Sequence, residues 1–179
     1  MTFYSAEVGA RTVFDPQLFA RTPDVSAGIG PQNIEHAAAL APVTLSAPSE
    51  TPLYTATAQP AGITLGQWKA AGGESSVACE AGAESIQSTF TNLLPTGVYG
   101  LFIVHFNVTG PARCTPAGTG NSVNPSSAGA ATHATTFSPC LAAGDGLVLV
   151  WNSSGPPHAS PASLGITQHN QLIVRAPTG

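Results

Sequence analysis

Short stretches in which hydrophobic residues alternate with polar ones run along most of the chain. From residue 43 onward these stretches are separated by Pro, Gly, Asn and Ser, which favour turns. Alternation with a period of two is the pattern of a β-strand that buries one face. The predicted strands are Val43–Ala47, Leu53–Ala58, Ile63–Trp68, Val77–Glu80, Ser85–Leu93, Val98–Val108, Ala134–Ser138, Gly146–Trp151 and Leu164–Arg175.

The strongest of these elements is Val98–Val108, which is apolar over almost its whole length. Such a run predicts a central strand that is covered on both faces. The preceding Leu94–Gly97 segment predicts a turn, because Pro95 occupies its second position. We therefore expect an all-β fold over residues 43–179: an antiparallel β-sandwich of about seven to nine strands, either immunoglobulin-like, cupredoxin-like or of the jelly-roll type.

The first 42 residues follow neither a sustained helical nor a sustained strand period, and prolines interrupt them repeatedly. We predict an irregular, extended N-terminal arm over residues 1–42, with one short helix at Pro31–Leu40 that has Pro31 in its first turn. The arm is too rich in large apolar residues for a solvated tail, so we expect it to dock either on its own domain or on a neighbouring subunit. The candidate contact residues are Phe3, Tyr4, Phe14, Leu18 and Phe19.

Charged residues make up 8% of the chain, against about 25% in a typical soluble domain. The five Lys and Arg residues are scattered, which excludes nucleic-acid binding because phosphate neutralisation needs clustered cations. No apolar run is long enough to predict a membrane-spanning helix, and the first residues lack the pattern of a signal peptide. An uncharged surface is typical of exported and shell proteins, so we expect an extracellular or cell-surface protein, with a virion component as the alternative.

The three cysteines are Cys79, Cys114 and Cys140, and none belongs to a CxxC pair, which excludes a zinc ribbon or a thioredoxin-type site. Cys114 and Cys140 bracket a loop rich in Gly, Ser, Asn and Pro. A disulfide that closes a flexible loop of this length constrains the unfolded chain by about 3 kcal/mol. We therefore predict a Cys114–Cys140 disulfide and a buried free thiol at Cys79.

Several short segments resemble a group of uncharacterised exported bacterial and archaeal β-sandwich proteins, which pair a "GVY" strand with a late "H-x-QL" strand. The resemblance covers roughly residues 62–175 and implies a β-sandwich fold and export, without an assigned activity. The segments that carry it are Ser76–Glu80, Ser85–Phe90, Leu93–Tyr99, Gly146–Ser154, His158 and Thr167–Ile173.

Reactive side chains offer little evidence of catalysis or of metal binding. Gly-x-Ser-x-Gly is absent, and no pair of carboxylates stands out, so we expect no enzymatic activity. No HxH or HExxH spacing occurs, and we expect no metal or other cofactor. The alternative is a metal site formed by His105, His158 and His169, because three imidazoles that converge from different strands can bind zinc or copper.

Large aromatic residues at strand positions, such as Trp68 and Trp151, are usually part of a core, and we interpret them so. The alternative is an exposed platform on which a sugar stacks. The leading hypothesis is a non-enzymatic structural or interaction protein: a β-sandwich subunit of an extracellular or surface assembly that uses its arm to contact copies of itself or a larger protein surface. Three alternatives remain, namely a capsid decoration protein, a carbohydrate- or small-ligand-binding module and a histidine-based metalloprotein.

Overall fold

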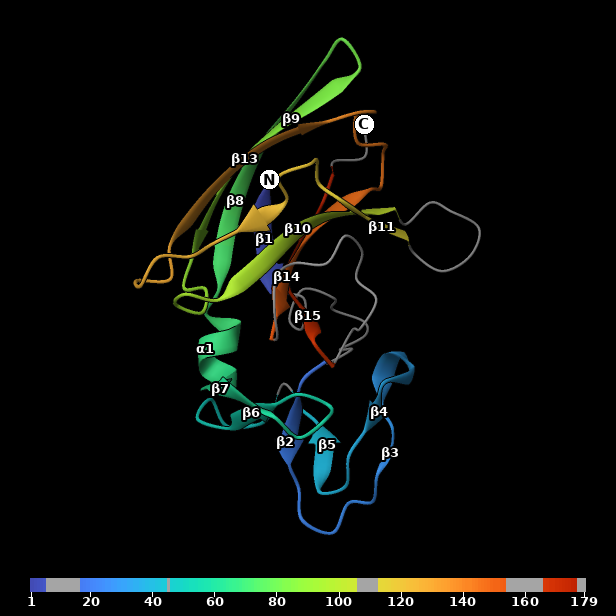
Figure 1. Ribbon diagram of the computed structural model, residues 1–179, viewed down its shortest axis with the longest axis vertical. Helices are drawn as coiled ribbons and strands as arrows, with labels where there is room; N and C mark the ends of the chain where they lie inside the picture. The colour runs from blue at the N-terminus through green and yellow to red at the C-terminus, as the bar shows by residue number, and fades with distance from the viewer. Residues whose placement is uncertain (6–16, 45, 106–112, 154–165, 177–179) are drawn as a thin grey trace.

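The computed structural model describes residues 1–5, 17–44, 46–105, 113–153 and 166–176, and it is almost entirely β (Figure 1). The prediction of an all-β, sandwich-like fold is confirmed. The elements are β1 Thr2–Ser5, β2 Phe19–Arg21, β3 Gly28–Ile29, the 3₁₀ turn Pro31–Asn33, β4 Glu35–His36, β5 Leu40–Pro42, β6 Pro52–Tyr54, β7 Pro60–Thr64, α1 Leu65–Lys69, β8 Gly72–Glu80, β9 Ala83–Thr91, β10 Val98–His105, β11 Arg113–Pro116, β12 Ser122–Val123, β13 Ala131–Phe137, β14 Gly146–Asn152 and β15 Gln168–Arg175.

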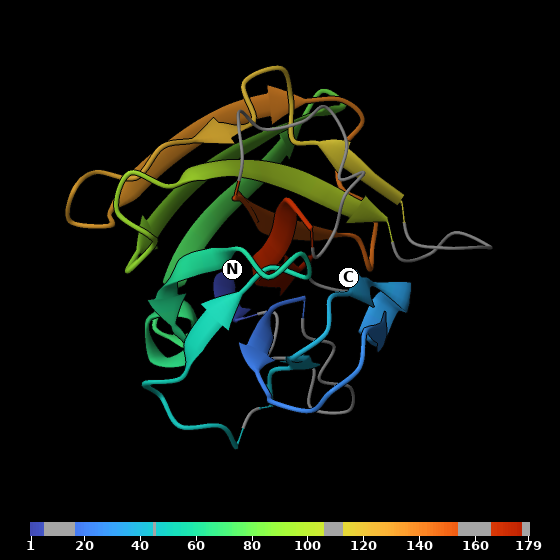
Figure 2. The ribbon, with the colours of Figure 1, turned by 60° about the horizontal axis from the view of Figure 1, so that its bottom comes forward.

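Most strands belong to one large curled antiparallel sheet, which has nine strands among the described residues. Its order is β11-β10-β14-β15-β1-β8-β9-β13, and β12 pairs with β10 beside β11. The N-terminal β1 connects the two halves of this sheet, because Thr2 and Phe3 pair with β8 while Tyr4 and Ser5 pair with β15. Figure 2 shows the large sheet as an arch, and a small second sheet lies below the arch in this view.

The main core fills the inside of the curled sheet. Along β9, Glu84, Ile86, Ser88 and Phe90 are buried and the residues between them are exposed, as the alternation predicts. β10 and β14 instead bury residues on both faces. Their inner residues join the main core, and their outer residues form a second cluster, namely Phe102, Val104, Val148 and Val150. The prediction that Val98–Val108 contains a central strand covered on both faces is confirmed for the described part, Val98–His105.

The small sheet, with the order β5-β2-β6-β7, lies beside the β3–β4 hairpin and has its own core of Phe19, Ile34, Leu40 and Ala56. Helix α1 leads from this sheet to β8 (Figure 1). A capping box begins the helix: the Thr64 side chain accepts the N–H of Gln67, and the Gln67 side chain accepts the N–H of Thr64.

Two of the predicted elements are wrong. Instead of a helix over Pro31–Leu40, the chain makes a single 3₁₀ turn and then enters β4, because Gln32 adopts a left-handed φ of 55° that ends helical geometry. Instead of a strand over Ile63–Trp68, β7 ends at Thr64 and α1 follows. The predicted Val43–Ala47 strand is also displaced, since β5 ends at Pro42.

The boundary predicted at residue 42 does not divide the structure into an arm and a domain. β1 lies inside the large sheet, between β15 and β8. β2 pairs with β5 and also with β6, which lies beyond residue 42. The first residues are therefore integral parts of both sheets, and the prediction of a separate irregular arm is corrected.

Candidate functional site

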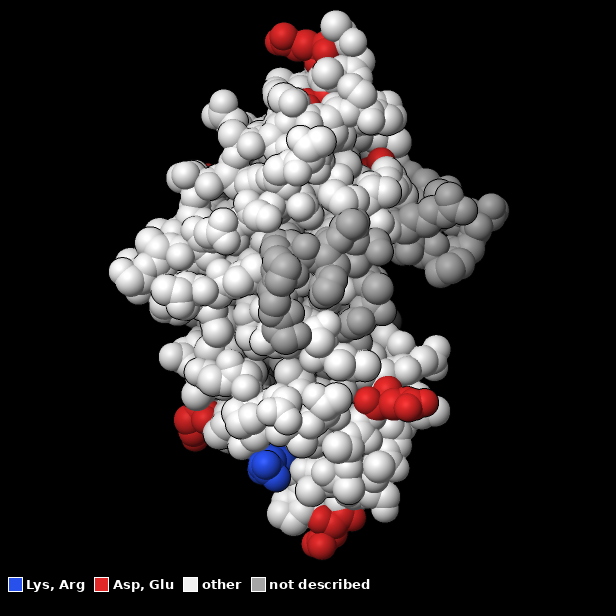
Figure 3. All heavy atoms as spheres, viewed as in Figure 1, with Lys and Arg blue, Asp and Glu red and all other residues white. Residues whose placement is uncertain are grey.

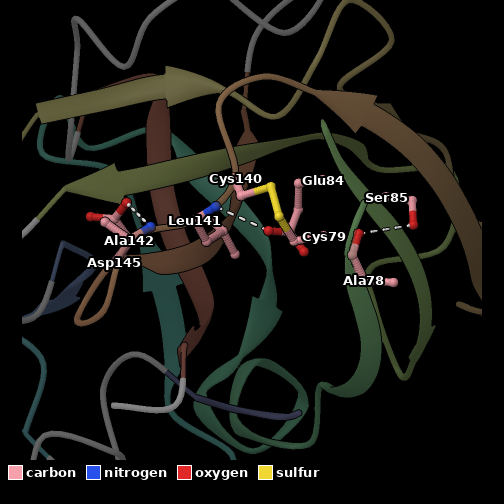
Figure 4. The surroundings of a disulfide bond; sticks show 8 residues. All are labelled: Ala78, Cys79, Glu84, Ser85, Cys140, Leu141, Ala142 and Asp145. Atoms are coloured by element: carbon pink, nitrogen blue, oxygen red, sulfur yellow. Dashed lines mark hydrogen bonds between the residues drawn. A yellow bond between two sulfur atoms is a disulfide. The ribbon is translucent and has the colours of Figure 1, made fainter. Parts of the chain in front are cut away.

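The disulfide joins Cys79 to Cys140, and the predicted Cys114–Cys140 pairing is wrong (Figure 4). Strand register explains the pairing: Cys79 on β8 lies opposite Glu84 on β9, which lies opposite Phe137 on β13. The chain that leaves β13 crosses the start of β9 and brings the Cα of Cys140 within 5.8 Å of the Cα of Cys79. Cys79 is thus neither free nor buried. Cys114 is the half-buried free thiol of the described residues, and burial raises its pKa.

Three of the five candidate subunit-contact residues are buried within their own chain. Phe3 packs against Phe90 in the main core, with ring centroids 5.2 Å apart, and Leu18 and Phe19 are fully buried. None of the three is available to a neighbouring subunit, so their assignment to an intersubunit contact is corrected. Tyr4 is 38% exposed, and Phe14 lies outside the described residues.

Trp68 and Trp151 form an edge-to-face pair inside the main core, with ring centroids 5.9 Å apart. Trp68 is fully buried and Trp151 is 6% exposed. The core interpretation is confirmed, and the alternative of an exposed platform for a sugar is wrong.

The three candidate histidines do not form a common site within the described residues. His105 ends β10, whereas His169 pairs with Trp151, which in turn pairs with Tyr99 at the other end of β10. Six residues of strand separate Tyr99 from His105, so the two imidazoles lie roughly 20 Å apart. His158 lies outside the described residues. The metal site proposed for this triad is therefore corrected.

The late "H-x-QL" residues hold the N-terminal part of the chain against β15. The Nδ1–H of His169 donates to the carbonyl oxygen of Gln17 at 3.1 Å, and the backbone N–H of Asn170 donates to Gln17 Oε1 at 2.7 Å. The Gln171 side chain donates to the carbonyl oxygen of Trp68 at 3.1 Å. Burial lowers the pKa of His169 to about 4, so the imidazole is neutral at physiological pH. These residues have a structural role.

A cleft of about 600 Å³ opens at one end of the large sheet, beside the segment that follows β13. Its wall is partly apolar, and a cluster of polar side chains meets in it. The residues that line it include Ile103, His105, Thr115, Thr119, Leu141 and Asp145. Sequence reasoning singled out only His105 among them, because strand register and the course of the chain after β13 bring the others to it.

His105 connects a hydroxyl to a carboxylate inside this cleft. Its Nδ1 lies 3.1 Å from Asp145 Oδ2, and its Nε2 lies 3.3 Å from Thr115 Oγ1. Asp145 is 4% exposed and also accepts the N–H of Ala142 at 3.0 Å, which fixes its orientation. Hydroxyl, imidazole and carboxylate in this order resemble the arrangement of an activated nucleophile.

Thr115 is nevertheless poorly suited to acyl transfer. The residue after it is Pro116, which has no N–H to donate to an oxyanion. Because such a donor beside the nucleophile contributes strongly to acyl-transfer catalysis, the arrangement is better suited to anchoring a polar group of a bound molecule. We therefore interpret His105, Asp145 and Thr115 as a hydrogen-bonding cluster.

A second candidate surface is the outside of β8, β9 and β13, which we call the outer polar face. It consists of exposed residues that alternate with buried or half-buried ones along the three strands: Glu74, Ser76, Ala78, Glu80, Ser85, Gln87, Thr89, Thr132, Ala134 and Thr136. Most of them, with Thr2 of β1, line a shallow groove of about 530 Å³. Its only charged side chain is Glu74. Charged residues are also sparse and isolated on the face seen in Figure 3.

No family model, curated protein or solved structure matches this chain. Within the described residues, no helix has the length and apolarity that crossing a membrane requires. The cleft, the outer polar face and the disulfide are the features of the described residues that bear on function.

Proposed function

We propose that this protein is a non-enzymatic structural subunit that associates with copies of itself through the outer polar face. The observation that carries the proposal is the composition of that face, where three neighbouring strands present Ser, Thr, Ala and Gln with two carboxylates, Glu74 and, at the hairpin end, Glu80. The outer polar face, which is exposed, takes the place of the N-terminal residues that the sequence predicts as subunit contacts.

Covering such a face costs little conformational entropy, because most of its side chains are short. Burying a Lys or Arg side chain costs about 1.5–2 kcal/mol of conformational entropy, and burying an Ala side chain costs none. Two hydroxyls of the face are already held by their own sheet: Ser85 Oγ donates to the carbonyl oxygen of Ala78 at 3.2 Å, and Ser76 Oγ donates to that of Gln87 at 3.5 Å. A partner therefore meets side chains that are short and partly ordered.

Electrostatics favours a second copy as the occupant. The net charge of the chain is −4, and the charged side chains of the face are Glu74 and, at its hairpin end, Glu80, so two copies that meet there bring few like charges together. The Cys79–Cys140 disulfide supports an extracellular or surface location, because disulfides persist in oxidising compartments. A capsid decoration protein is the alternative with the same surface requirements.

The test places like charges on the face and compares them with the same charges elsewhere. Ser76→Lys with Gln87→Lys adds two lysines at positions that lie opposite each other on β8 and β9. Ser46→Lys with Gln59→Lys adds the same charge at exposed positions of the small-sheet loops. Sedimentation velocity across a wide concentration range should show self-association of the wild type and the control pair, and a monomer for the face pair. A wild type that is monomeric at millimolar concentration refutes the proposal.

The cleft supports a second candidate function, the binding of a small ligand that has an apolar body and one polar group. Ile103 and Leu141 supply apolar contacts, and the His105 cluster supplies a hydrogen-bonding anchor. An anilinonaphthalene sulfonate dye is a suitable probe. Its fluorescence should rise with the wild type and with Thr44→Trp, an exposed control, and should not rise with Thr119→Trp, which fills the cleft. Equal binding by the three proteins excludes the cleft.

A further inference from the structure

We propose that Cys79, Cys140 and Glu84 form a zinc site when the disulfide is reduced, so that the same three residues join β8, β9 and the segment after β13 in both redox states. The inference is independent of the proposed self-association. It rests on how the fold assembles two sulfurs and a carboxylate at the rim of the large sheet (Figure 4).

The three potential ligand atoms already lie close together. The two Sγ atoms and a carboxylate oxygen of Glu84 all lie within 4.8 Å of one another. In a tetrahedral zinc site, with Zn–S bonds of about 2.3 Å and Zn–O bonds of about 2.0–2.2 Å, ligand atoms are about 3.5–3.8 Å apart. Glu84 therefore has to move little. Cys79 is exposed, so its side chain is free to rotate once it is released.

Glu84 is an unusual neighbour for a purely structural disulfide. It is 4% exposed, on a face of β9 whose other buried members are Ile86, Ser88 and Phe90. Its Oε2 accepts the backbone N–H of Leu141 at 3.0 Å, and Leu141 directly follows Cys140. Carboxylates that ligate a metal are commonly held in orientation by a hydrogen bond of this kind. The bond thus points the carboxylate at the place where the sulfurs meet.

The chemistry balances with a thiol or phosphine reductant. Reduction adds two electrons and two protons to the Cys79–Cys140 bond and yields two thiols. A thiol reductant is oxidised to its disulfide, and a phosphine takes the oxygen of one water molecule to become a phosphine oxide, the same water supplying the two protons. One zinc ion then displaces the two thiol protons, which are released to solvent. Two thiolates and one carboxylate leave a fourth position, which water can occupy because Cys79 is exposed. Affinity should rise with pH, since the thiols must lose their protons.

The consequence is a clamp that works in reducing and oxidising surroundings. In oxidising surroundings the disulfide holds the segment after β13 against the β8–β9 hairpin. In a reducing compartment zinc would hold the same segments. This segment also carries Asp145, so the geometry of the cleft would be kept in both states.

The test uses the full chain with Cys114→Ser, so that the only thiols are Cys79 and Cys140. After reduction with a phosphine under exclusion of oxygen, the protein is titrated with Co²⁺, which gives a thiolate-to-cobalt charge-transfer band in the near ultraviolet. We expect one equivalent of Co²⁺ to bind, Zn²⁺ to displace it, and Cys79→Ser to abolish the band. Absence of a thiolate band in the parent protein overturns the proposal.

Glu84→Gln tests the third ligand, and Glu80→Gln is its matched control on the same hairpin, where the carboxylate is exposed. Loss of a group that only supports a metal ligand typically costs 10- to 100-fold in metal affinity, so loss of the ligand Glu84 in Glu84→Gln should cost at least that much, and Glu80→Gln nothing. Equal affinities overturn the role of Glu84. Far-ultraviolet circular dichroism of the oxidised variants shows whether each is folded. Cadmium NMR of the parent protein reports the ligand set without a variant at Glu84. A chemical shift typical of sulfur ligands alone also overturns the role of Glu84.

Discussion

His169 makes the folded protein sensitive to acid, and the structure gives the size of the effect. The imidazole is buried against Trp151, with ring centroids 5.1 Å apart, and burial lowers its pKa from 6.5 to about 4. Its Nδ1–H donates to Gln17, and its Nε2 has no hydrogen-bond partner among the described residues. A proton on Nε2 would therefore create a buried charge without a partner.

The sign follows from the lowered pKa. Above pH 6.5 the histidine is neutral in the folded and unfolded states, and its contribution to stability is fully present. As the pH falls from 6.5 to about 4, the unfolded state binds a proton that the folded state does not, and stability is lost. One pKa unit corresponds to about 1.4 kcal/mol, so the loss over this window is about 3 kcal/mol.

The measurement is the free energy of unfolding by urea at pH 7 and at pH 4, for the wild type and for His169→Phe. Phe keeps a ring against Trp151 but does not titrate, so the wild type should lose about 3 kcal/mol more than the variant between the two pH values. Leu172→Ala, a buried control on the same strand, should lower stability by about 2–5 kcal/mol and keep the wild-type pH dependence. Equal pH dependence of wild type and His169→Phe would refute the reasoning.

Three further predictions concern stability, each measured by urea unfolding. Cys79→Ala, which breaks the bond to Cys140 across a sequence separation of 61, should cost about 4 kcal/mol under oxidising conditions and little under reducing conditions without metal. Gly118→Ala should destabilise the protein by more than 1 kcal/mol, because Gly118 has a φ of +77° and a Cβ there would lie 2.6 Å from the carbonyl oxygen of Thr136. Tyr99→Phe should cost about 1–3 kcal/mol, because the Tyr99 hydroxyl accepts a backbone N–H at 3.0 Å in the turn before β10.

The sequence predicts those strands of the large sheet whose pattern of apolar and polar residues reveals which of their faces are buried. β10 and β14 are apolar on both faces, and the alternation in β9 identifies its buried side. The turn before β10 follows from Pro95, and it is closed by a hydrogen bond from the N–H of Gly97 to the carbonyl oxygen of Leu94. These features depend on neighbours in the sequence, and such signals are readable without a structure.

Helix α1 was missed although its signal is present. Thr64 and Gln67 form the T-x-x-Q pattern of a capping box, but the apolar residues Ile63, Leu65 and Trp68 suggested strand alternation. The inward position of Glu84 was also readable, since it shares the alternation of Ile86. At residues 63–68 the capping box and the strand-like alternation predict different structures, and the chain adopts the helix.

The disulfide and the cleft depend on strand register, which the sequence does not specify alone. The loop between Cys114 and Cys140 made that pair attractive, but the entropy of closing a loop cannot rank pairings whose Cα distances are unknown. In the same way, His105, Thr115 and Asp145 meet because β11 and the segment before β14 end beside β10. The position of β1 depends on pairs such as Tyr4 with Ile173, which lie near opposite ends of the sequence. Local patterns carry no signal of such a pair, so residues 1–42 have the pattern of an arm.

That position of β1 also governs how the chain can acquire its structure during synthesis. Among the described strands, β1 borders β15, so the halves of the large sheet cannot be joined through β1 until residues 168–175 have left the ribosome. Until then β14 and the Tyr4–Ser5 part of β1 lack their partner strand β15, and unpaired strand edges of this kind are open to other chains. The protein should therefore fold late and slowly for its size, because its contacts close long loops.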